Sequence, residues 1–206
     1  MRYPDSDKIR MMFKNCIYQI CRIIFTPIFK AYFHPRIINA DRIPGNGPII
    51  LAGNHKHALD PLLVDICTKR TVHALAKSEL FEGFFAFFFK AIGAIPVYLD
   101  APKNPEAYAS TKAILLNDEV INISPEAARN YTSEILLPFK TGAVRLAKET
   151  HTAILPYCIT GDYRFRSDSL KIVFGETIEF GDEDTEEANK RLYEAIKTLL
   201  LENRND

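Results

Sequence analysis

Short apolar runs alternate along the chain with segments in which apolar residues recur at helical spacing. The runs predict buried strands over residues 48–52, 71–76, 91–99, 119–123, 153–159 and 170–174. Helical spacing and start signals predict helices from residue 60, over 104–116, over 143–149 and after residue 184. Asn104 before Pro105 is a predicted N-cap, and Asp184 with Glu187 is a predicted capping box. Strands that alternate with helices are typical of βαβ units, so we predict one α/β domain. It should have three layers, with helices flanking a largely parallel central sheet.

The first 40 residues follow a different pattern. Residues 8–25 place apolar side chains at i, i+3 and i+4, with lysine and arginine mostly on the other side. Pro27 interrupts the pattern, so we predict a second short helix that reaches residue 33 and ends before His34-Pro35. No stretch reaches the roughly 18 apolar residues of a membrane-spanning helix.

This predicted helix pair has two interpretations. It packs on the domain, or it lies in the membrane interface with basic side chains toward anionic headgroups. We favour the membrane interface, because large apolar residues are more abundant here than one core contact needs. Residues 1–40 are therefore predicted to be membrane-associating helices, and residues 41–206 the α/β domain.

The most apolar segment, residues 84–89, holds five phenylalanines in six positions, within a helix predicted to open at residues 77–81. A segment that is apolar on all sides is buried in protein or in lipid. Since five rings exceed what one core face takes, we predict that some line a groove for an acyl chain or touch the bilayer.

Charge and cysteine content exclude several classes of function. The 26 Lys and Arg balance the 26 Asp and Glu, and a net charge of zero argues against nucleic acid as a partner. The first 40 residues nevertheless carry seven Lys or Arg and two Asp, which makes them a local basic region. The four cysteines form no C-x-x-C pair, which fits a reducing cytosol and predicts neither a disulfide framework nor a zinc site.

Candidate chemistry lies in the turn that follows the strand predicted at residues 48–52. His55 and Asp60 lie between this strand and a predicted helix, where α/β sheets usually place their sites. A carboxylate that orients a histidine fixes its tautomer and makes the ring a general base. The alternative is structural, with Asp60 as an N-cap before Pro61 and His55 bonded only to the turn.

The motif Asn54-His55-x4-Asp60 resembles the first conserved block of the glycerolipid acyltransferases, the lysophosphatidic acid acyltransferase family. Later segments resemble further blocks of this family in order and spacing, so the resemblance covers roughly residues 41–175. These segments are Gly93-Ala94-Ile95-Pro96-Val97, Pro125-Glu126 with Arg129, Phe139-Lys140-Thr141-Gly142-Ala143, and the strand around Pro156.

The resemblance implies that Lys77, Glu126 and Arg129 bind the substrate. Arg129 has the fork geometry that suits a phosphate, although an ion pair with Glu126 is an equally open interpretation. Lys77 has the alternative of being an ordinary surface lysine. The chain departs from the family at three positions, where Leu99 replaces an arginine associated with the acceptor's phosphate and Ala127 and Ala128 replace a glycine and a threonine.

The resemblance implies an O-acyltransferase at the cytosolic face of a membrane. His55 would take the proton from the hydroxyl of a lysophospholipid, by default 1-acylglycerol 3-phosphate, giving phosphatidic acid. The acyl donor would be a thioester of acyl carrier protein or coenzyme A, with no cofactor and no metal. We expect backbone N–H groups near Asp60 and Pro61 to stabilise the oxyanion.

Three alternatives stay open. The first is an acyltransferase that uses another lipid acceptor, and the second is a non-catalytic lipid-binding protein of the same fold; both are motivated by the three departures. The third is a metal-dependent hydrolase, because His55-x-His57-x-x-Asp60 is loosely similar to a zinc-binding pattern. Only His73 and His151 remain downstream as further histidine ligands.

Overall fold

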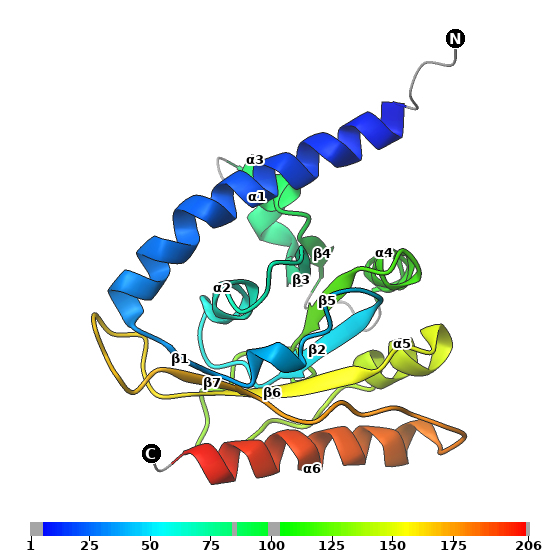
Figure 1. Cartoon of the computed structure of the whole chain (residues 1–206). Helices are drawn as coiled ribbons and strands as arrows, with labels where there is room; N and C mark the ends of the chain where they lie inside the picture. Colours follow the sequence, from blue (N-terminus) through cyan, green and yellow to red (C-terminus); the bar gives the residue numbers. More distant parts are fainter. Residues whose placement is uncertain (1–5, 84–85, 99–103, 205–206) are drawn as a thin grey trace.

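Seven strands form one sheet in the order β1-β7-β6-β2-β5-β3-β4 (Figure 1). The computed structural model describes residues 6–83, 86–98 and 104–204. Of the strand pairs in this described part, β6–β7 is antiparallel and the others are parallel, which confirms the predicted sheet. The strands are β1 (Arg36–Ile38), β2 (Ile49–Gly53), β3 (Val72–Lys77), β4 (Ile95–Val97), β5 (Val120–Ile123), β6 (Ile154–Thr160) and β7 (Lys171–Phe174).

Helices cover both faces of the sheet and give the predicted three layers (Figure 1). α1 (Ser6–Phe33) and α2 (Asp60–Asp65) lie on one face. The opposite face carries α4 (Pro105–Leu116), α5 (Gly142–Thr150) and α6 (Thr185–Asn203). The short helix α3 (Ala86–Ala91) follows a 3-10 turn at Ser78–Phe81, and another 3-10 turn lies at Ala40–Arg42.

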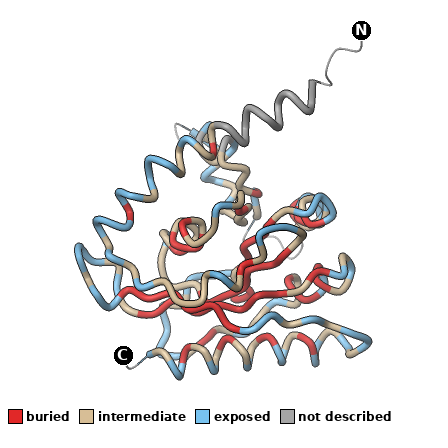
Figure 2. Tube along the Cα trace, in the orientation of Figure 1, coloured by how far each residue is buried: buried red, intermediate tan, exposed pale blue. Residues whose placement is uncertain are grey.

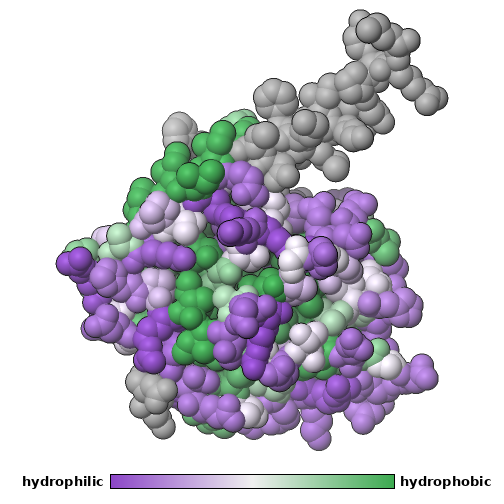
Figure 3. All heavy atoms as spheres, viewed as in Figure 1, coloured by the Kyte–Doolittle hydropathy of each residue, from purple (hydrophilic) through white to green (hydrophobic). Residues whose placement is uncertain are grey.

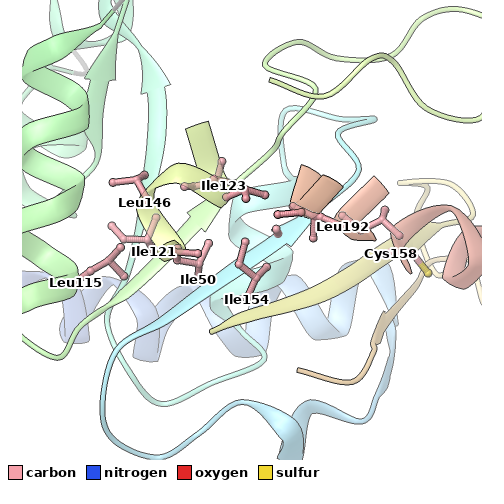
Figure 4. Close-up of a cluster of buried hydrophobic side chains, with 14 of the residues drawn as sticks. Ile50, Leu115, Ile121, Ile123, Leu146, Ile154, Cys158 and Leu192 are labelled. Atoms are coloured by element: carbon pink, nitrogen blue, oxygen red, sulfur yellow. The ribbon is translucent and has the colours of Figure 1, made fainter. Parts of the chain in front are cut away.

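The alternation of side chains along β2 divides the core into two clusters. Ile50 and Ala52 pack toward α4, α5 and α6, whereas Ile49 and Leu51 pack toward α1 and α2. Figure 4 shows the first cluster, in which isoleucines of adjacent strands meet leucines of the helices. Buried positions accordingly follow the sheet and the inward sides of the helices (Figure 2). A strand buried on both faces reads as a continuous apolar run, and this is how β2 was recognisable.

The other predicted elements match closely, except at β1, at β4 and in the helix predicted to open at residues 77–81, which is divided into the 3-10 turn Ser78–Phe81 and α3. β1 was not predicted, because three residues at the sheet edge leave no periodic pattern. The strand predicted over residues 91–99 is reduced to β4. The predicted cap of α6 is confirmed, since the Asp184 carboxylate accepts from the Glu187 N–H at 2.8 Å. Asn104 is at the N-cap position of α4, but its side chain makes no capping hydrogen bond, because its oxygen accepts from the Tyr98 N–H at 2.7 Å.

The N-terminal segment is one helix, so the predicted break at Pro27 is wrong. Tertiary contacts on both sides of Pro27 offset the backbone hydrogen bond that a proline removes. Before it, the Tyr18 hydroxyl donates to the Asp65 carboxylate, and after it Phe29 is buried against the domain. The helix ends at the predicted place, where His34 takes a left-handed φ of 47°. α1 therefore packs on the domain along one side.

Part of the phenylalanine-rich segment lies beyond what the structure describes. Phe84 and Phe85 fall outside the described residues, as does Leu99. Phe87 is 73% exposed, whereas Phe89 packs against Phe81 with ring centroids 5.9 Å apart. The predicted acyl-chain groove in this segment therefore stays a prediction.

Candidate active site

Three neighbouring parallel strands end at one edge of the sheet, and the candidate site is built on the loops that follow them. β5, β2 and β6 lie side by side, with Ile123 opposite Ala52 and Tyr157 opposite Gly53. The carboxyl ends of parallel strands are where open α/β sheets bind their ligands. The loops after β2, β5 and β6 bring His55, Glu126 and Tyr163 to this edge.

His55 and Asp60 contact each other across the turn after β2. His55 Nδ1 lies 2.9 Å from Asp60 Oδ2, which also accepts the N–H groups of Lys56 and His57 at 2.8 Å. Asp60 is only 1% exposed, whereas the side chain of His55 is 23% exposed. With Nδ1 donating to a carboxylate, the unprotonated Nε2 is left as the basic nitrogen. We call this pair the dyad.

The predicted alternative, in which Asp60 only caps the helix, is wrong. The N-cap of α2 is Leu59, and no side chain caps this end of the helix. The Asp60 carboxylate turns back toward the preceding turn, where its three N–H contacts fix the turn around His55. The residue spacing allowed both geometries, and the structure has the one that a general base needs.

Three backbone N–H groups of this turn, those of Lys56, His57 and Asp60, are not available as the oxyanion donors that we expected near Asp60 and Pro61. The N–H groups of Lys56 and His57 already donate to Asp60. The Asp60 N–H donates to the His57 carbonyl at 3.1 Å, and Pro61 has no N–H. These groups hold the dyad rather than a reacting oxygen.

Asn54 anchors this turn to the neighbouring strand β6. Its side-chain oxygen accepts from the Ile159 N–H at 2.7 Å, and its amide nitrogen donates to the Ile159 carbonyl at 3.0 Å. Asn54 is buried, so these two bonds satisfy polar atoms that water does not reach. The Asn54 side chain thus continues the hydrogen bonding between β2 and β6 beyond the end of β2. It thereby fixes the position of the backbone at His55.

Glu126 supports the His55 backbone in this structure, and its predicted role in substrate binding stays a prediction. Its Oε1 accepts from the His55 N–H at 2.9 Å, and its Oε2 accepts from the Leu137 N–H at 2.7 Å. The residue is only 4% exposed, and burial raises the pKa of its carboxyl above the usual range. Glu126 therefore ties the loop after β5 to the backbone of the dyad.

Arg129 and Lys77 reach the surface near the same sheet edge. Arg129 is exposed and lies over the Tyr131 ring at 5.5 Å, and the described residues show no ion pair between Arg129 and Glu126. The structural alternative for Arg129 is thereby removed. Lys77 ends β3 with a side chain that is 49% exposed and forms an ion pair with Glu79 at 2.8 Å. Neither cation takes part in the contacts of the dyad described here, so the predicted binding roles of Arg129 and Lys77 stay predictions.

Tyr163 is the site residue that the sequence did not indicate. Its hydroxyl donates to Asp60 Oδ1 at 2.7 Å, and its ring stacks on His57 with centroids 4.4 Å apart. His57 is a turn-bonding residue as expected, because its Nδ1 accepts from the Leu59 N–H at 3.2 Å. The only signal for Tyr163 in the sequence is its position just after a predicted strand.

The described residues around the dyad do not form a set of metal ligands. In the part of the chain that the structure describes, no group of three or more His, Cys, Asp or Glu is placed to hold a metal ion. His73 bonds to the Gly93 carbonyl at 2.8 Å and to the Glu119 carboxylate at 2.6 Å, and His151 follows the end of α5. The histidines that a hydrolase site would need are therefore used elsewhere.

Ala127 adopts a left-handed backbone, with φ of 56°, where the family usually has glycine. A Cβ in this conformation costs about 1–2 kcal/mol, which exceeds the roughly 0.5–1 kcal/mol that a glycine loses in backbone entropy. We therefore expect Ala127→Gly to raise the free energy of unfolding by about 0.5 kcal/mol. Urea titration of both proteins measures this difference.

Ala128→Gly is the matched control, because Ala128 is the exposed neighbour and is not among the described residues with positive φ. Glycine there relieves nothing and should lower stability by about 0.5–1 kcal/mol. If both substitutions lower stability equally, the left-handed strain at Ala127 is contradicted.

Comparison with known proteins supports the resemblance seen in the sequence. The family model described as acyltransferase matches residues 34–160, which include the dyad, Glu126 and β6. A 1-acyl-sn-glycerol-3-phosphate acyltransferase of Saccharomyces cerevisiae is 29% identical over 119 residues, covering 55% of this chain and 39% of that protein. A protein of the same name from Borreliella burgdorferi is 30% identical over 132 residues, covering 63% and 52%. The chain thus spans about half the length, or less, of these curated relatives.

The crystal structure of the 1-acyl-sn-glycerophosphate (LPA) acyltransferase PlsC from Thermotoga maritima has the same fold. The TM-score is 0.72 at 20% identity, and the match covers 97% of this chain and 83% of that one. Since the family model spans more than half of the chain and contains the His55 turn, this chain belongs to the acyltransferase family.

Proposed function

We propose that the protein transfers a fatty acyl group from an acyl thioester to the hydroxyl of a lysophospholipid. The single observation that carries this proposal is the contact of His55 Nδ1 with the buried Asp60 carboxylate at 2.9 Å, which leaves Nε2 as the base. The relatives named 1-acyl-sn-glycerol-3-phosphate acyltransferases favour 1-acylglycerol 3-phosphate as acceptor and phosphatidic acid as product.

The proposed reaction needs only the dyad and two bound substrates. His55 Nε2 takes the proton of the acceptor hydroxyl as the oxygen attacks the thioester carbonyl carbon. The tetrahedral intermediate then expels the thiolate, which takes the proton back from the imidazolium, so that one ester and one thiol are formed. A positioned base contributes about 10²- to 10⁴-fold in rate, and the remainder comes from holding both substrates in reacting geometry. Acyl carrier protein or coenzyme A would carry the acyl group.

Arg129 is the side chain that we propose for the acceptor's phosphate. Arg129 lies in the same loop as Glu126, which accepts from the His55 N–H. Its side chain is exposed and lies over the Tyr131 ring, and this ring contact does not use the N–H donors of the guanidinium. A guanidinium binds a phosphate through two parallel hydrogen bonds. Lys77, at the end of β3, is a second candidate cation at the same sheet edge.

The acceptor is tested by following acyl transfer from a labelled thioester to a panel of lysolipids with and without a phosphomonoester. We expect lysophosphatidic acid to be preferred, and Arg129→Gln to raise its KM about tenfold while a neutral lysolipid is unaffected. Lys190→Gln is the matched loss of charge away from the dyad, because Lys190 is exposed on α6, across the sheet from α1 and α2. Preference for another acceptor would support the alternative substrate that Leu99, Ala127 and Ala128 motivate, and no transfer by folded protein would support the lipid-binding alternative.

We also propose that α1 attaches the protein to a membrane surface, at the cytosolic face. Within the described ranges, no helix combines the length and the hydropathy needed to cross a bilayer. One stripe of α1 instead exposes large apolar side chains, seen as the green patch on this helix in Figure 3. We call it the outer face of α1: Ile20, Ile23, Ile24, Ile28 and Tyr32, each 48–71% exposed.

Basic residues border the outer face of α1. Lys30, Arg164 and Arg166 are exposed, and Phe165 extends the apolar surface by packing on Tyr32 with centroids 5.0 Å apart. An apolar stripe with cations beside it is the pattern of a helix that lies in an anionic interface. Attachment there would place the loop of Tyr163, and with it the dyad, next to lipid substrates.

Flotation with vesicles that contain an anionic phospholipid tests this attachment. We expect Ile24→Glu to lower the fraction of protein bound to vesicles about tenfold or more. The substitution removes apolar area that the membrane would bury, and it adds repulsion between the glutamate and the anionic headgroups. Leu201→Glu is the matched control, since Leu201 on α6 is 49% exposed and lies across the sheet from α1. Equal binding by wild type and Ile24→Glu would contradict the role of the outer face.

A further inference from the structure

The second oxygen of the Asp60 carboxylate, Oδ1, has no role in the proposed reaction. Oδ2 accepts from His55 Nδ1 and from two backbone N–H groups, and Oδ1 accepts from the Tyr163 hydroxyl at 2.7 Å. Asp60 is 1% exposed, so water does not replace a donor that is lost from Oδ1. Burial, followed by the charge of Asp60, raises the pKa of the Tyr163 hydroxyl far above its usual range, so this group stays a donor.

The ring of Tyr163 is held from two sides by different parts of the chain. His57, in the dyad's own turn, stacks on it at 4.4 Å between centroids with planes 20° apart. Phe33 and Phe29 of α1 meet it edge to face, at 5.6 Å and 6.5 Å. Such aromatic contacts fix the rotamer of the ring and therefore the place of its hydroxyl.

The loop that carries Tyr163 is itself fastened to the end of α1. The Arg166 N–H donates to the Tyr32 carbonyl at 2.7 Å, and Phe165 packs on the Tyr32 ring. An unbroken set of contacts thus leads from α1 through Tyr163 to the catalytic carboxylate. Two sides of α1 thus differ. Tyr18, Phe29 and Phe33 face the domain, whereas the outer face of α1 does not.

We propose that Tyr163 is a positioning residue for acyl transfer, which fixes Asp60 through Oδ1 and so links the packing of α1 to the geometry of the dyad. This inference rests on the proposed function, because it assumes that His55 is the base and Asp60 its partner. Tyr163 acts through Asp60 and does not itself contact the reacting atoms.

The loss of this hydroxyl has a predictable sign. Without the donor on Oδ1, the negative charge of Asp60 is less stabilised and attracts the proton on His55 more strongly. We therefore expect the acid limb of the pH–rate profile to move to higher pH. The Asp60 carboxylate is then held through Oδ2 alone, so it orients the imidazole less well and the rate at the plateau falls.

Tyr163→Phe tests the proposal, because it removes the hydroxyl and keeps the ring contacts. We expect kcat to fall about tenfold while KM for both substrates stays within about twofold. The acid limb of kcat/KM should move to higher pH by about half a unit. The unfolding midpoint of each variant is measured alongside, so that lost stability is separated from lost positioning.

Tyr157→Phe is the matched control. Tyr157 is also a buried tyrosine at this edge of the sheet, but its hydroxyl donates to Asn122 at 2.9 Å. We expect this variant to lose stability and to keep the pH profile of the wild type. A second test combines Tyr163→Phe with Asp60→Asn, where the Tyr163 substitution should have no further effect on kcat.

Three results would overturn the inference. The first is a Tyr163→Phe variant with unchanged kcat and unchanged pH profile. The second is a Tyr157→Phe variant whose pH profile shifts as much as that of Tyr163→Phe. The third is a combined variant in which the losses of kcat from Tyr163→Phe and Asp60→Asn multiply. If His55→Ala is inactive while Tyr163→Phe is fully active, this inference fails and the proposed function stands. If His55→Ala is as active as the wild type, the proposed function fails as well.

Discussion

Replacing His55 by alanine is expected to lower kcat for acyl transfer by about 10²- to 10⁴-fold, the contribution of a positioned general base. The reason is geometric, since His55 Nδ1 is committed to Asp60 at 2.9 Å and Nε2 is the nitrogen available to the acceptor hydroxyl. Alanine removes both nitrogens and keeps the backbone N–H that donates to Glu126. The turn should therefore survive, and activity rather than folding should be lost.

The measurement compares initial rates and unfolding midpoints of His55→Ala with those of the wild type. His57→Gln is a control in the same turn, because His57 accepts only from the Leu59 N–H and stacks on Tyr163. We expect its loss of rate to stay below about tenfold. Equal losses in the two variants would show that the turn matters as a whole and that His55 has no special role.

Asp60→Asn is the second substitution with a large expected effect, again about 10²- to 10⁴-fold in kcat. Three N–H donors face Oδ2, so the amide of asparagine should place its oxygen there and its nitrogen toward Tyr163. The shape of the site is then kept while the negative charge is removed. The imidazolium that forms during transfer is no longer stabilised by a carboxylate.

This substitution also has a pH signature. A carboxylate beside a histidine favours the charged ring, so we expect its removal to move the acid limb of kcat/KM to lower pH. The shift is opposite in sign to the one expected for Tyr163→Phe. An acid limb that stays in place, in a protein that still turns over, would mean that Asp60 does not act through His55.

Features of the fold and of the site that depend on neighbouring residues could be predicted from the sequence. β2 is buried on both faces, so its composition is apolar throughout, and the turn after it carries His55 and Asp60 within six consecutive residues. The dyad could be predicted because one turn supplies both of its members. The N-cap of α6 was predictable for the same reason, since Asp184 and Glu187 lie three positions apart.

Features that depend on the pairing of distant segments were not predictable. Tyr163 meets Asp60 across 103 positions of sequence, through the adjacency of β2 and β6, and no local pattern marks it. Glu126 was found by its motif, but its contact with the His55 backbone was not predictable, because this contact depends on the pairing of β2 with β5. Pro27 indicated a break in α1, which contacts at Tyr18 and Phe29 override.

The stoichiometry of a single turnover tests the central claim most directly. Purified protein is mixed with a labelled long-chain acyl thioester and lysophosphatidic acid, and the new ester, the free thiol and the free fatty acid are quantified together. The proposed function predicts one ester for each thiol released, no excess of free fatty acid, and no ester from His55→Ala. Thiol release accompanied by free fatty acid, or no consumption of thioester by folded protein, would contradict it.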